Sequence, residues 1–563
     1  AACGMRQDEA SRAGHARLPG GHMTSQLNSI VDRYIRTLLD DYPVFATFLG
    51  DHAHDDELGD FSPAAQDGKN SHLKELLSDL EQLDTTCATD EERIDAAALG
   101  AALRRSVFEH EELLVHRKKP AGYVGVVLSG CNELVLGDFA PVDVRARSLL
   151  GRLRKVPQVM RDMEDNLSDP PSAFAGVGAD IARGGVSFAR QVVPMFGEAV
   201  PSLSSDLAKA GDAAAEAFGG AAEYLDRFAD SPEPFHVGRE PFEWLLSEYH
   251  MLEMDSSELR EVGREVLEQT RLRMSEVAAE IEPGRDVHDV LEEIKSEHPH
   301  AEGLRARYAD EMSKAREFVR EHDLVTIPDH EELEVIDTPV FLRKLLPYAA
   351  YHPAGPLEKK QRGMFYVTPA DTGLSPEEQE RQLRGHSVHT IPIVALHEAY
   401  PGHHLQLIRS NACDRRVRKV LWNTVFIEGW ALYCEEMMRE AGFYTDPKTR
   451  LGQLKEVLWR AARVVVDVGL QLGEMSIDDG IEFMMKEVAL ERVNATAEVR
   501  RYAANPTQPS SYLIGKLAVM SIRNRYESRA GSDFSLKAFH DELLDTGSIQ
   551  PRLVEAALGL RPL

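Results

Sequence analysis

Apolar residues recur with a helical period along most of the chain from residue 25 onward. In the segment 28–39 the apolar positions fall on one stripe, at intervals of three to four residues, as on one face of a helix. Similar stripes predict helices at 73–83, 91–116, 144–167, 203–228, 243–281 and 303–321, and again from 375 to the end. The pattern therefore predicts a mainly α-helical protein.

The helical pattern lapses between residues 323 and 370. Leu324–Ile327 and Met364–Thr368 are short apolar runs that contain β-branched and aromatic residues, so they predict strands. The second run fits either an ordinary hairpin or an edge strand that pairs with an extended substrate. We expect an N-terminal helical part, 23–322, and a catalytic part, 323–563, which together form one unit with a cleft.

A second lapse, at residues 168–178, leads into a glycine-rich stretch that contains Gly178 and Gly185. Glycines at this density resemble a phosphate-binding loop, but no strand precedes them and no lysine follows in the required place. We therefore interpret this stretch as a flexible connector.

The net charge of the chain limits the classes of molecule that we expect it to bind. The 563 residues include 93 acidic and 64 basic ones, which gives a formal net charge of -29. Such a surface repels phosphate backbones and anionic lipids, so we expect no nucleic-acid partner. No run of about 18 apolar residues occurs, so we also expect no membrane span.

The first 22 residues lack the apolar segment of a signal peptide, and we interpret 1–22 as a leader, a tag or a disordered tail. An alternative is that Ala1-Ala-Cys3-Gly4 is the trimmed end of a lipoprotein signal. The cysteines are scattered without any C-x-x-C pair, which favours reduced, buried thiols. These observations predict a cytoplasmic protein, with an exported lipoprotein as the alternative; the cysteines are Cys3, Cys87, Cys131, Cys413 and Cys434.

The strongest chemical signal is the segment His397-Glu-Ala-Tyr-Pro-Gly-His-His404. A histidine supplies a neutral imidazole nitrogen for zinc, and a neighbouring glutamate, here Glu398, can take a proton from water at the metal. The common motif H-E-x-x-H places its two histidines four residues apart on one helix face. Here Pro401 occupies the position of the second histidine, so the second ligand must be another residue of the segment.

Two geometries remain open for the second ligand. In an uninterrupted helix His404 returns to the face of His397, with a rise of roughly 10.5 Å between the two residues. Alternatively, Pro401-Gly402 breaks the helix and loops out two residues, so that His403 becomes the second ligand. The sequence favours neither histidine over the other.

A catalytic zinc site needs a third protein ligand. Glu428 opens an acidic amphipathic helix 24 residues after His404, which is a suitable distance for a helix, a turn and a returning helix. Two turns further along the same face, Glu435 is placed to orient a ligand histidine. We therefore expect one Zn²⁺ per chain, held by His397, by His403 or His404, and by Glu428.

The segment Glu428-Gly-Trp-Ala-Leu-Tyr433 resembles the part of glutamate-zincin aminopeptidases that supplies the third zinc ligand. Together with the histidine segment it is similar to the bacterial "domain of unknown function 885" family. Pro43–Gly50 resembles the amino-terminal signature of that family, and Arg501–Gly515 resembles the carboxy-terminal one. The resemblance implies a mostly helical fold with a deep cleft, and it strengthens the metal hypothesis more than any hypothesis about substrate.

These observations predict a zinc metallopeptidase in which Glu398 is the general base and then the general acid. Tyr512 and Arg501 are candidates to stabilise the oxyanion that forms on the attacked carbonyl. The predicted substrate is a peptide or a peptide-like amide. Alternatives are a zinc hydrolase of small non-peptide amides or esters, and a metal-free scaffold. Lys516 is predicted to be a solvated charge, and His386 to lie in a solvent-facing loop.

Overall fold

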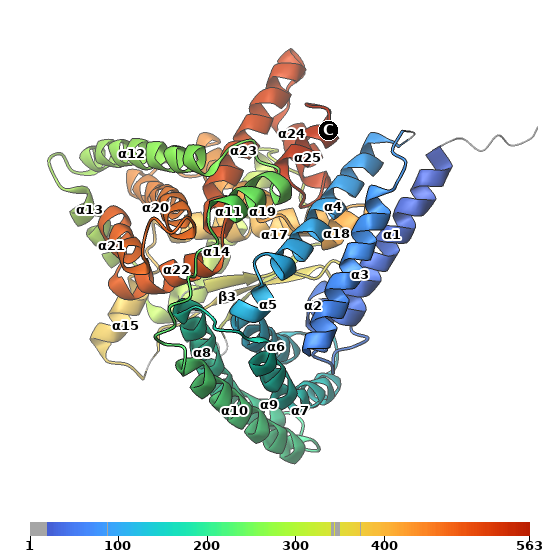
Figure 1. The fold of residues 1–563 in the computed structure, drawn as a ribbon. Helices are drawn as coiled ribbons and strands as arrows, with labels where there is room; N and C mark the ends of the chain where they lie inside the picture. Colours follow the sequence, from blue (N-terminus) through green and yellow to red (C-terminus); the bar gives the residue numbers. More distant parts are fainter. Residues whose placement is uncertain (1–19, 87, 339–342, 344–348, 372) are drawn as a thin grey trace, which may run out of the picture.

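The computed structural model describes residues 20–86, 88–338, 343, 349–371 and 373–563, and helices dominate it (Figure 1). The prediction of a mainly α-helical fold is confirmed. The segment predicted to be a leader or tail lies outside the described residues up to residue 19, and the first helix begins at Gly20.

The N-terminal helices form one side of the molecule, and the C-terminal helix α25 (Pro551–Ala557) lies beside α4 there. The segments involved are α1 (Gly20–Asp41), α2 (Pro43–Leu49), α3 (Pro63–Glu81), α4 (Asp90–Glu111) and α5 (Val115–Lys118).

The next helices pack together into a lobe at the bottom of Figure 1. They are α6 (Ala121–Leu136), α7 (Val142–Asn166), α8 (Ser172–Ser187), a π-helical turn η1 (Phe188–Val192), α9 (Val193–Glu198) and α10 (Ser204–Asp226). They have a hydrophobic core of their own.

Helix α8 occupies the stretch that the sequence analysis interprets as a flexible connector, so that interpretation is wrong. The glycines serve close packing instead. A Cβ on Gly178 would stand 2.7 Å from the Pro120 ring, and a Cβ on Gly185 would stand 2.7 Å from the Phe218 ring. The missing side chains therefore let neighbouring segments approach a regular helix.

A third group of helices leads to the sheet: α11 (Arg239–Trp244), the π-helical turn η2 (Leu245–Tyr249), α12 (Ser256–Ile281), α13 (Val287–Ser296), η3 (Ala301–Gly303) and α14 (Leu304–Glu321). The apolar stripe at 243–281 is thus divided among α11, η2 and α12. The interruption has a local cause, because Asp255 caps α12 and forms a reciprocal capping box with Glu258.

The small sheet contains β1 (Glu332–Asp337), β2 (Ala349–His352) and β3 (Arg362–Val367) in the order β1-β3-β2. The prediction of a strand near Met364 is confirmed, but β3 is the central strand. It pairs parallel with β1 and antiparallel with β2, so both of its hydrogen-bonding edges are occupied. The hypothesis that this strand binds substrate by edge pairing is therefore wrong.

Leu324–Ile327 does not form the predicted strand. It is a connector that contributes Leu324 and Val325 to the core, while Thr326 donates from its backbone and its hydroxyl to the Asp541 carboxylate (2.8 and 2.7 Å). A short buried apolar run satisfies the strand pattern without having a pairing partner.

The C-terminal part is helical, as predicted. It contains α15 (Pro376–Leu383), α16 (Ile391–Glu398), α17 (His403–Ala412), α18 (Arg416–Val420), α19 (Thr424–Glu440), α20 (Pro447–Gln471), α21 (Ile477–Val488), α22 (Arg492–Ala504), α23 (Gln508–Ala530), η5 (Gly531–Asp533), α24 (Leu536–Asp545) and α25. Helix α19 contacts α16, α17 and α23, so it lies at the centre of this part.

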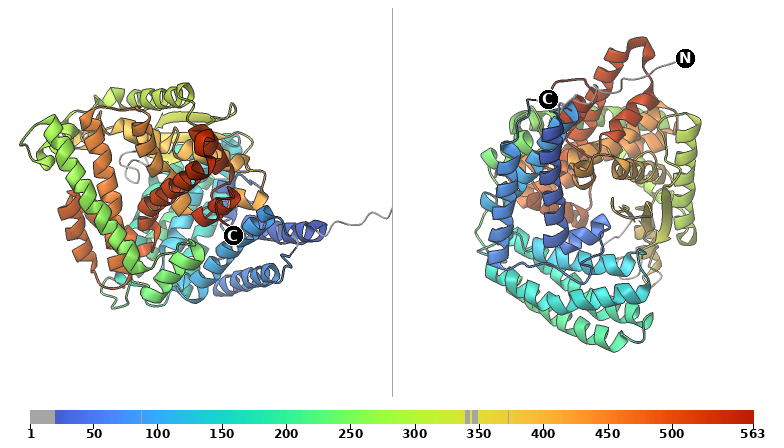
Figure 2. Two further views of the ribbon diagram at one scale, coloured as in Figure 1. Left: turned by 90° about the horizontal axis from the view of Figure 1, so that it is seen from above. Right: turned by 90° about the vertical axis from the view of Figure 1, so that its right-hand side faces the viewer.

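The largest hydrophobic core extends from Leu27 in α1 to Leu558 after α25. It joins α1, α3 and α4 to the sheet and to α16, α19 and α23, so both predicted parts of the chain share it. Figure 2 shows the arrangement of the helices and the sheet from two further directions. A further core lies between α12 and α20–α22. Cys131, Cys413 and Cys434 are buried free thiols, as expected.

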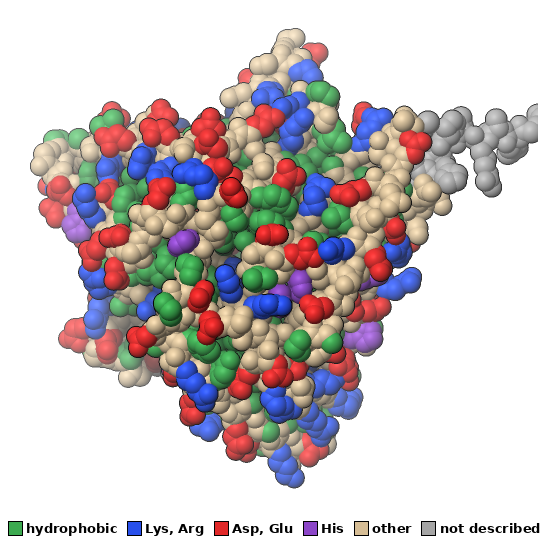
Figure 3. All heavy atoms as spheres, viewed as in Figure 1, with side chains coloured by type: hydrophobic (Ala, Val, Ile, Leu, Met, Phe, Trp, Pro, Cys, Tyr) green, Lys and Arg blue, Asp and Glu red, His purple; other side chains and the backbone are tan. Residues whose placement is uncertain are grey.

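Acidic and basic side chains are interspersed over the face shown in Figure 3. Among the described residues, none of the helices has both the length and the apolar character needed to cross a bilayer.

Candidate metal centre

Helices α16 and α17 are successive parts of one interrupted helical path. The Gly402 N–H donates to the Leu396 carbonyl (3.0 Å), six residues back instead of four. Leu405 makes the same six-residue bond to Ala399 (3.3 Å). Two residues are therefore looped out of the helical ladder, and the alternative of an uninterrupted helix is wrong.

Two features form this loop. A Cβ on Gly402 would stand 1.8 Å from the His397 carbonyl oxygen, so only glycine fits there. The Trp430 indole N–H donates to the Pro401 carbonyl (2.8 Å), which ties the loop to α19. The Tyr400–Pro401 peptide bond is cis.

The loop brings three candidate metal-binding side chains together. Ligand atoms of His397, Glu398 and His403 all lie within 4.8 Å of one another. Within the described residues this is the one group of three histidine, cysteine or acidic side chains with that property. The two imidazole rings stand nearly perpendicular, with centroids 4.9 Å apart.

His404 points elsewhere. It is fully buried, its Nε2 lies 2.8 Å from a Glu331 carboxylate oxygen, and its Nδ1 lies 3.0 Å from the Tyr351 hydroxyl. Both ring nitrogens are therefore engaged by protein groups. Of the two histidines left open by the sequence, the structure places His403 beside His397.

Glu428, the predicted third ligand, lies beside the group of three without belonging to it. Its carboxylate is 3.4 Å from Nε2 of His403. Burial alone would raise the pKa of Glu428, but the neighbouring His403, His397 and Tyr512 together lower that pKa to about 2. Burial opposes the charged form of His403, yet Glu428 raises its pKa. The centre thus holds an ionised carboxylate against two imidazoles.

Glu435 occupies the position predicted for it. Its carboxylate is 1% exposed and lies 2.8 Å from Nδ1 of His397. A carboxylate there favours the tautomer that carries the proton on Nδ1, which leaves Nε2 of His397 as the electron-pair donor. Gln453 in α20 contacts the other oxygen of Glu435 at 3.4 Å.

Tyr512 reaches the centre because α19 and α23 touch backbone to backbone. A Cβ on Gly515 would stand 1.9 Å from the Val425 carbonyl oxygen, and a Cβ on Gly429 would stand 2.2 Å from the Gly515 carbonyl carbon. Tyr512 lies one turn before Gly515, and its hydroxyl is one of the groups that stabilise ionised Glu428. Burial, followed by Glu428, raises the pKa of Tyr512, so its hydroxyl keeps its proton near neutral pH.

Two arginines that the sequence analysis misses lie beside Tyr512. The guanidinium groups of Arg460 and Arg463 lie 5.7 and 4.7 Å from the centre of its ring. Nε of Arg460 and Nη1 of Arg463 are buried and have no hydrogen-bond partner among the described residues. Their sequence signal is weak: two arginines three positions apart in the largely apolar α20.

Arg501 is held differently from these two. It donates to Gln508 (2.6 Å) and to Glu498 (3.0 Å). The predictions for two further residues are wrong. Lys516 is buried, with its ammonium 4.0 Å from Glu436, and His386 is 2% exposed and packs in the interior.

The resemblance seen in the sequence agrees with a comparison of the whole chain. The family described as "Bacterial protein of unknown function (DUF885)" matches residues 43–558. The chain belongs to this family. No curated protein matches this DUF885 chain.

Two solved structures share the fold. One is described as "a putative lipoprotein of unknown function from Shewanella oneidensis"; it is 23% identical, covers 96% of this chain and 100% of its own, and has a TM-score of 0.77. The other is described as "the putative lipoprotein from Colwellia psychrerythraea"; it is 18% identical, covers 95% of this chain and 98% of its own, and has a TM-score of 0.82. At these identities the similarity shows that the DUF885 chain has the same fold as the two solved structures.

Proposed function

We propose that this DUF885 chain is a zinc-dependent hydrolase that cleaves peptide or peptide-like amide bonds. The observation that carries the proposal is the convergence of His397, Glu398 and His403, with Glu428 beside them. Within the described residues, His397, Glu398 and His403 are the one group of three possible metal ligands. They meet at a helix interruption where only glycine fits.

The donor set fits zinc. Zinc in proteins prefers imidazole nitrogen and carboxylate oxygen, and catalytic sites use three such ligands. Nδ1 of His403 is buried without a hydrogen-bond partner among the described residues, which suits a histidine awaiting a further ligand. Glu435 orients His397 as carboxylates orient zinc-binding histidines. We assign the metal to His397, His403 and Glu428.

Bound zinc would supply a Lewis acid that polarises a carbonyl and lowers the pKa of water. Glu398, next to the ligands, would take the proton from the attacking water and pass it to the leaving nitrogen. The Tyr512 hydroxyl, protonated near neutral pH, would donate a hydrogen bond to the developing oxyanion. The positive charges of Arg460 and Arg463 would add to this stabilisation.

Zinc analysis and turnover test the proposal together. Protein purified without chelator should hold close to one zinc per chain, lose activity with chelator and regain it with zinc. A peptide library with mass-spectrometric detection supplies the substrate. Glu398→Gln should keep the metal and lose about 10²–10⁴-fold in rate, because a positioned acid–base group contributes that much.

The surface variant Glu377→Gln serves as the control for this comparison and should behave like the parent. Zinc content near zero after reconstitution would refute the enzyme and favour a scaffold. Zinc binding without cleavage of any peptide, but with cleavage of small amides or esters, would refute the peptidase assignment alone.

For the cellular location we infer an exported lipoprotein. The chain contains Ala1-Ala-Cys3-Gly4, and both solved relatives are described as lipoproteins. Metabolic labelling with an alkyne fatty acid should mark the protein and should fail in Cys3→Ser. Absence of the label from the parent protein would favour the cytoplasmic prediction, and equal labelling of the two would place the lipid on another residue.

A further inference from the structure

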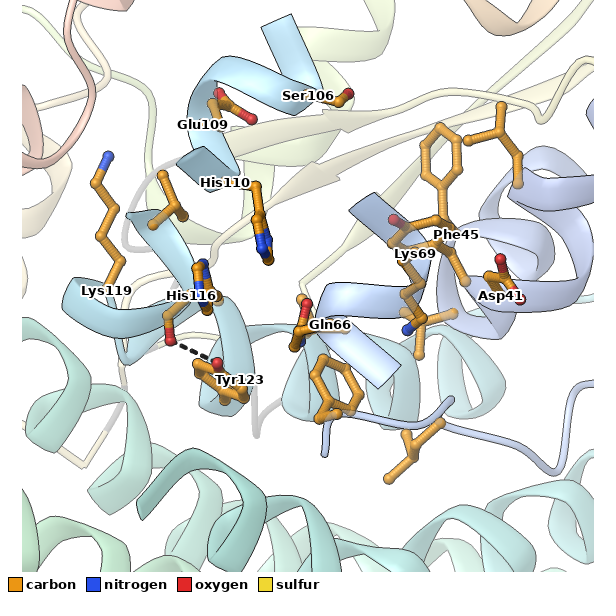
Figure 4. Close-up of a pocket in the computed structure, with 18 of the residues that line it drawn as sticks. Asp41, Phe45, Gln66, Lys69, Ser106, Glu109, His110, His116, Lys119 and Tyr123 are labelled. Atoms are coloured by element: carbon orange, nitrogen blue, oxygen red, sulfur yellow. Dashed lines mark hydrogen bonds between the residues drawn. The ribbon is translucent and has the colours of Figure 1, made fainter. Parts of the chain in front are cut away.

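A pocket of about 830 Å³ lies among the N-terminal helices, away from the metal centre (Figure 4). Helices α1 to α6 form most of its wall, and β2 closes one side through His352. None of the four candidate zinc-site side chains lines it. Its volume falls in the range of small-molecule sites, about 300–1,000 Å³.

The wall of the pocket is mainly aromatic and apolar. Six aromatic residues contribute to it: Tyr34, Tyr42, Phe45, Phe48, Phe61 and Tyr123. The rings of His110 and His116 face each other across the end of α4, stacked with centroids 4.0 Å apart. These surfaces favour a ligand that buries rings or branched apolar groups.

Most charged groups on the wall already have protein partners. The pairs are Lys69 with the Asp60 carbonyl (2.8 Å), Lys119 with the Ala504 carbonyl (2.6 Å), Glu109 with Arg105 (2.9 Å), His110 with Asp67 (3.3 Å) and Glu133 with His352 (3.1 Å). Lys69 also stands over the rings of Tyr42 and Phe61. Asp41 also lines the pocket; burial lowers the pKa of Lys69, and the neighbouring Asp41 opposes that effect. Acidic and basic groups thus accompany one another on the wall, and a ligand needs no net charge.

Two buried polar atoms on the wall have no hydrogen-bond partner among the described residues: Oδ1 of Asn70 and Nδ1 of His116. Asn70 is 8% exposed, and its amide nitrogen donates to Glu111, which identifies the free atom as the acceptor oxygen. Arg117 donates to Nε2 of His116, so the neutral ring carries its proton on Nδ1. Both atoms are closed off from solvent, so they lie behind the surface of the pocket, and the surface that a ligand would meet is mainly apolar.

We propose that this pocket is a binding site for an uncharged, mainly apolar molecule that carries aromatic or branched groups. The six aromatic rings of the wall would enclose its apolar body. The site does not depend on the proposed zinc chemistry. It lies on the other side of β2 from the metal-centre helices, because Tyr351 contacts His404 and the next residue, His352, lines the pocket.

The neighbouring helix α6 offers a matched pair of positions for a test. Gly122 lines the pocket and Gly125 does not, and a Cβ at either would meet no heavy atom within 4 Å. Gly122→Phe should therefore fill the pocket without a clash, whereas Gly125→Phe adds the same side chain to the same helix outside the lining. Ser129→Phe, at another exposed lining position of α6, is a second filling variant.

The probe is N-phenyl-1-naphthylamine, an uncharged diaryl amine whose fluorescence rises in apolar surroundings. The full chain should bind it saturably at one site. Gly122→Phe and Ser129→Phe should each weaken binding at least about tenfold, and Gly125→Phe should stay within about twofold of the parent. Circular dichroism and melting temperature confirm that each variant is folded.

The proposal is overturned if the parent shows no saturable binding, or if the two glycine variants bind the probe equally. It is also overturned if both filling variants fold and bind like the parent. Repeating the titration with zinc-free protein should leave the affinity unchanged, which keeps this result separate from the fate of the proposed hydrolase.

Discussion

Gly402→Ala probes the loop that creates the metal centre. Heavy atoms of real structures essentially never approach a Cβ within 3.0 Å, yet the alanine Cβ would stand 1.8 Å from the His397 carbonyl oxygen. The loop must therefore open by about 1.2 Å, whereas zinc–ligand distances tolerate only about ±0.2 Å. His397 and His403 can then no longer share one ion at normal bond lengths. We expect zinc affinity to fall at least about 100-fold, or about 2.8 kcal/mol.

Competition with a chromophoric chelator measures this affinity, and circular dichroism monitors the fold. Gly219→Ala is the matched control, because a Cβ at this helical glycine would meet no heavy atom within 4 Å. It should bind zinc like the parent. A folded Gly402→Ala protein with the parent's zinc affinity would refute the argument that the glycine loop sets the distance between the two histidines.

Three further predictions concern individual side chains. His403→Ala should lose zinc, whereas His404→Ala should keep it and lose about 1–3 kcal/mol of stability, because Glu331 loses a buried partner; equal zinc loss in both would contradict the ligand assignment. Glu435→Gln should weaken zinc binding about 10–100-fold, measured by chelator competition, because it removes the carboxylate that orients a ligand histidine. Tyr512→Phe should keep zinc and KM but lower kcat about 10²–10³-fold if its hydroxyl stabilises the oxyanion; an unchanged kcat would exclude that role.

Much of the fold follows from local patterns. The apolar stripe at 144–167 predicts α7 to within two residues at each end, because that helix buries one continuous face. The glycines of α8 lead to a wrong prediction of a flexible connector. They allow close contact with Pro120 and Phe218, which lie far away in the sequence. Strand order is equally non-local: the run at Met364 shows that a strand forms but not that it becomes the central one.

Some residues of the candidate site can likewise be predicted from the local sequence, and others cannot. The histidine segment and Glu428 are visible in the sequence because each belongs to a short, contiguous stretch of residues. The choice between His403 and His404 needs the six-residue hydrogen bonds of the loop, which no residue pattern specifies. Arg460 and Arg463 are missed because only the packing of α20 beside α23 brings them to Tyr512.

The contact between Gly429 and Gly515 has a consequence for how the protein fails on heating. The histidines and Glu428 lie on α16, α17 and α19, whereas Tyr512 lies on α23, which begins 80 residues after Glu428. Helices α19 and α23 touch backbone to backbone at the two glycines, and Arg523 joins them further along through Tyr433 and Glu440. Undocking of α23 would withdraw the proton donor and leave the ligands in place. For the proposed hydrolase, loss of activity on heating should therefore precede zinc release, and a heated sample should contain molecules that still hold metal but no longer turn over.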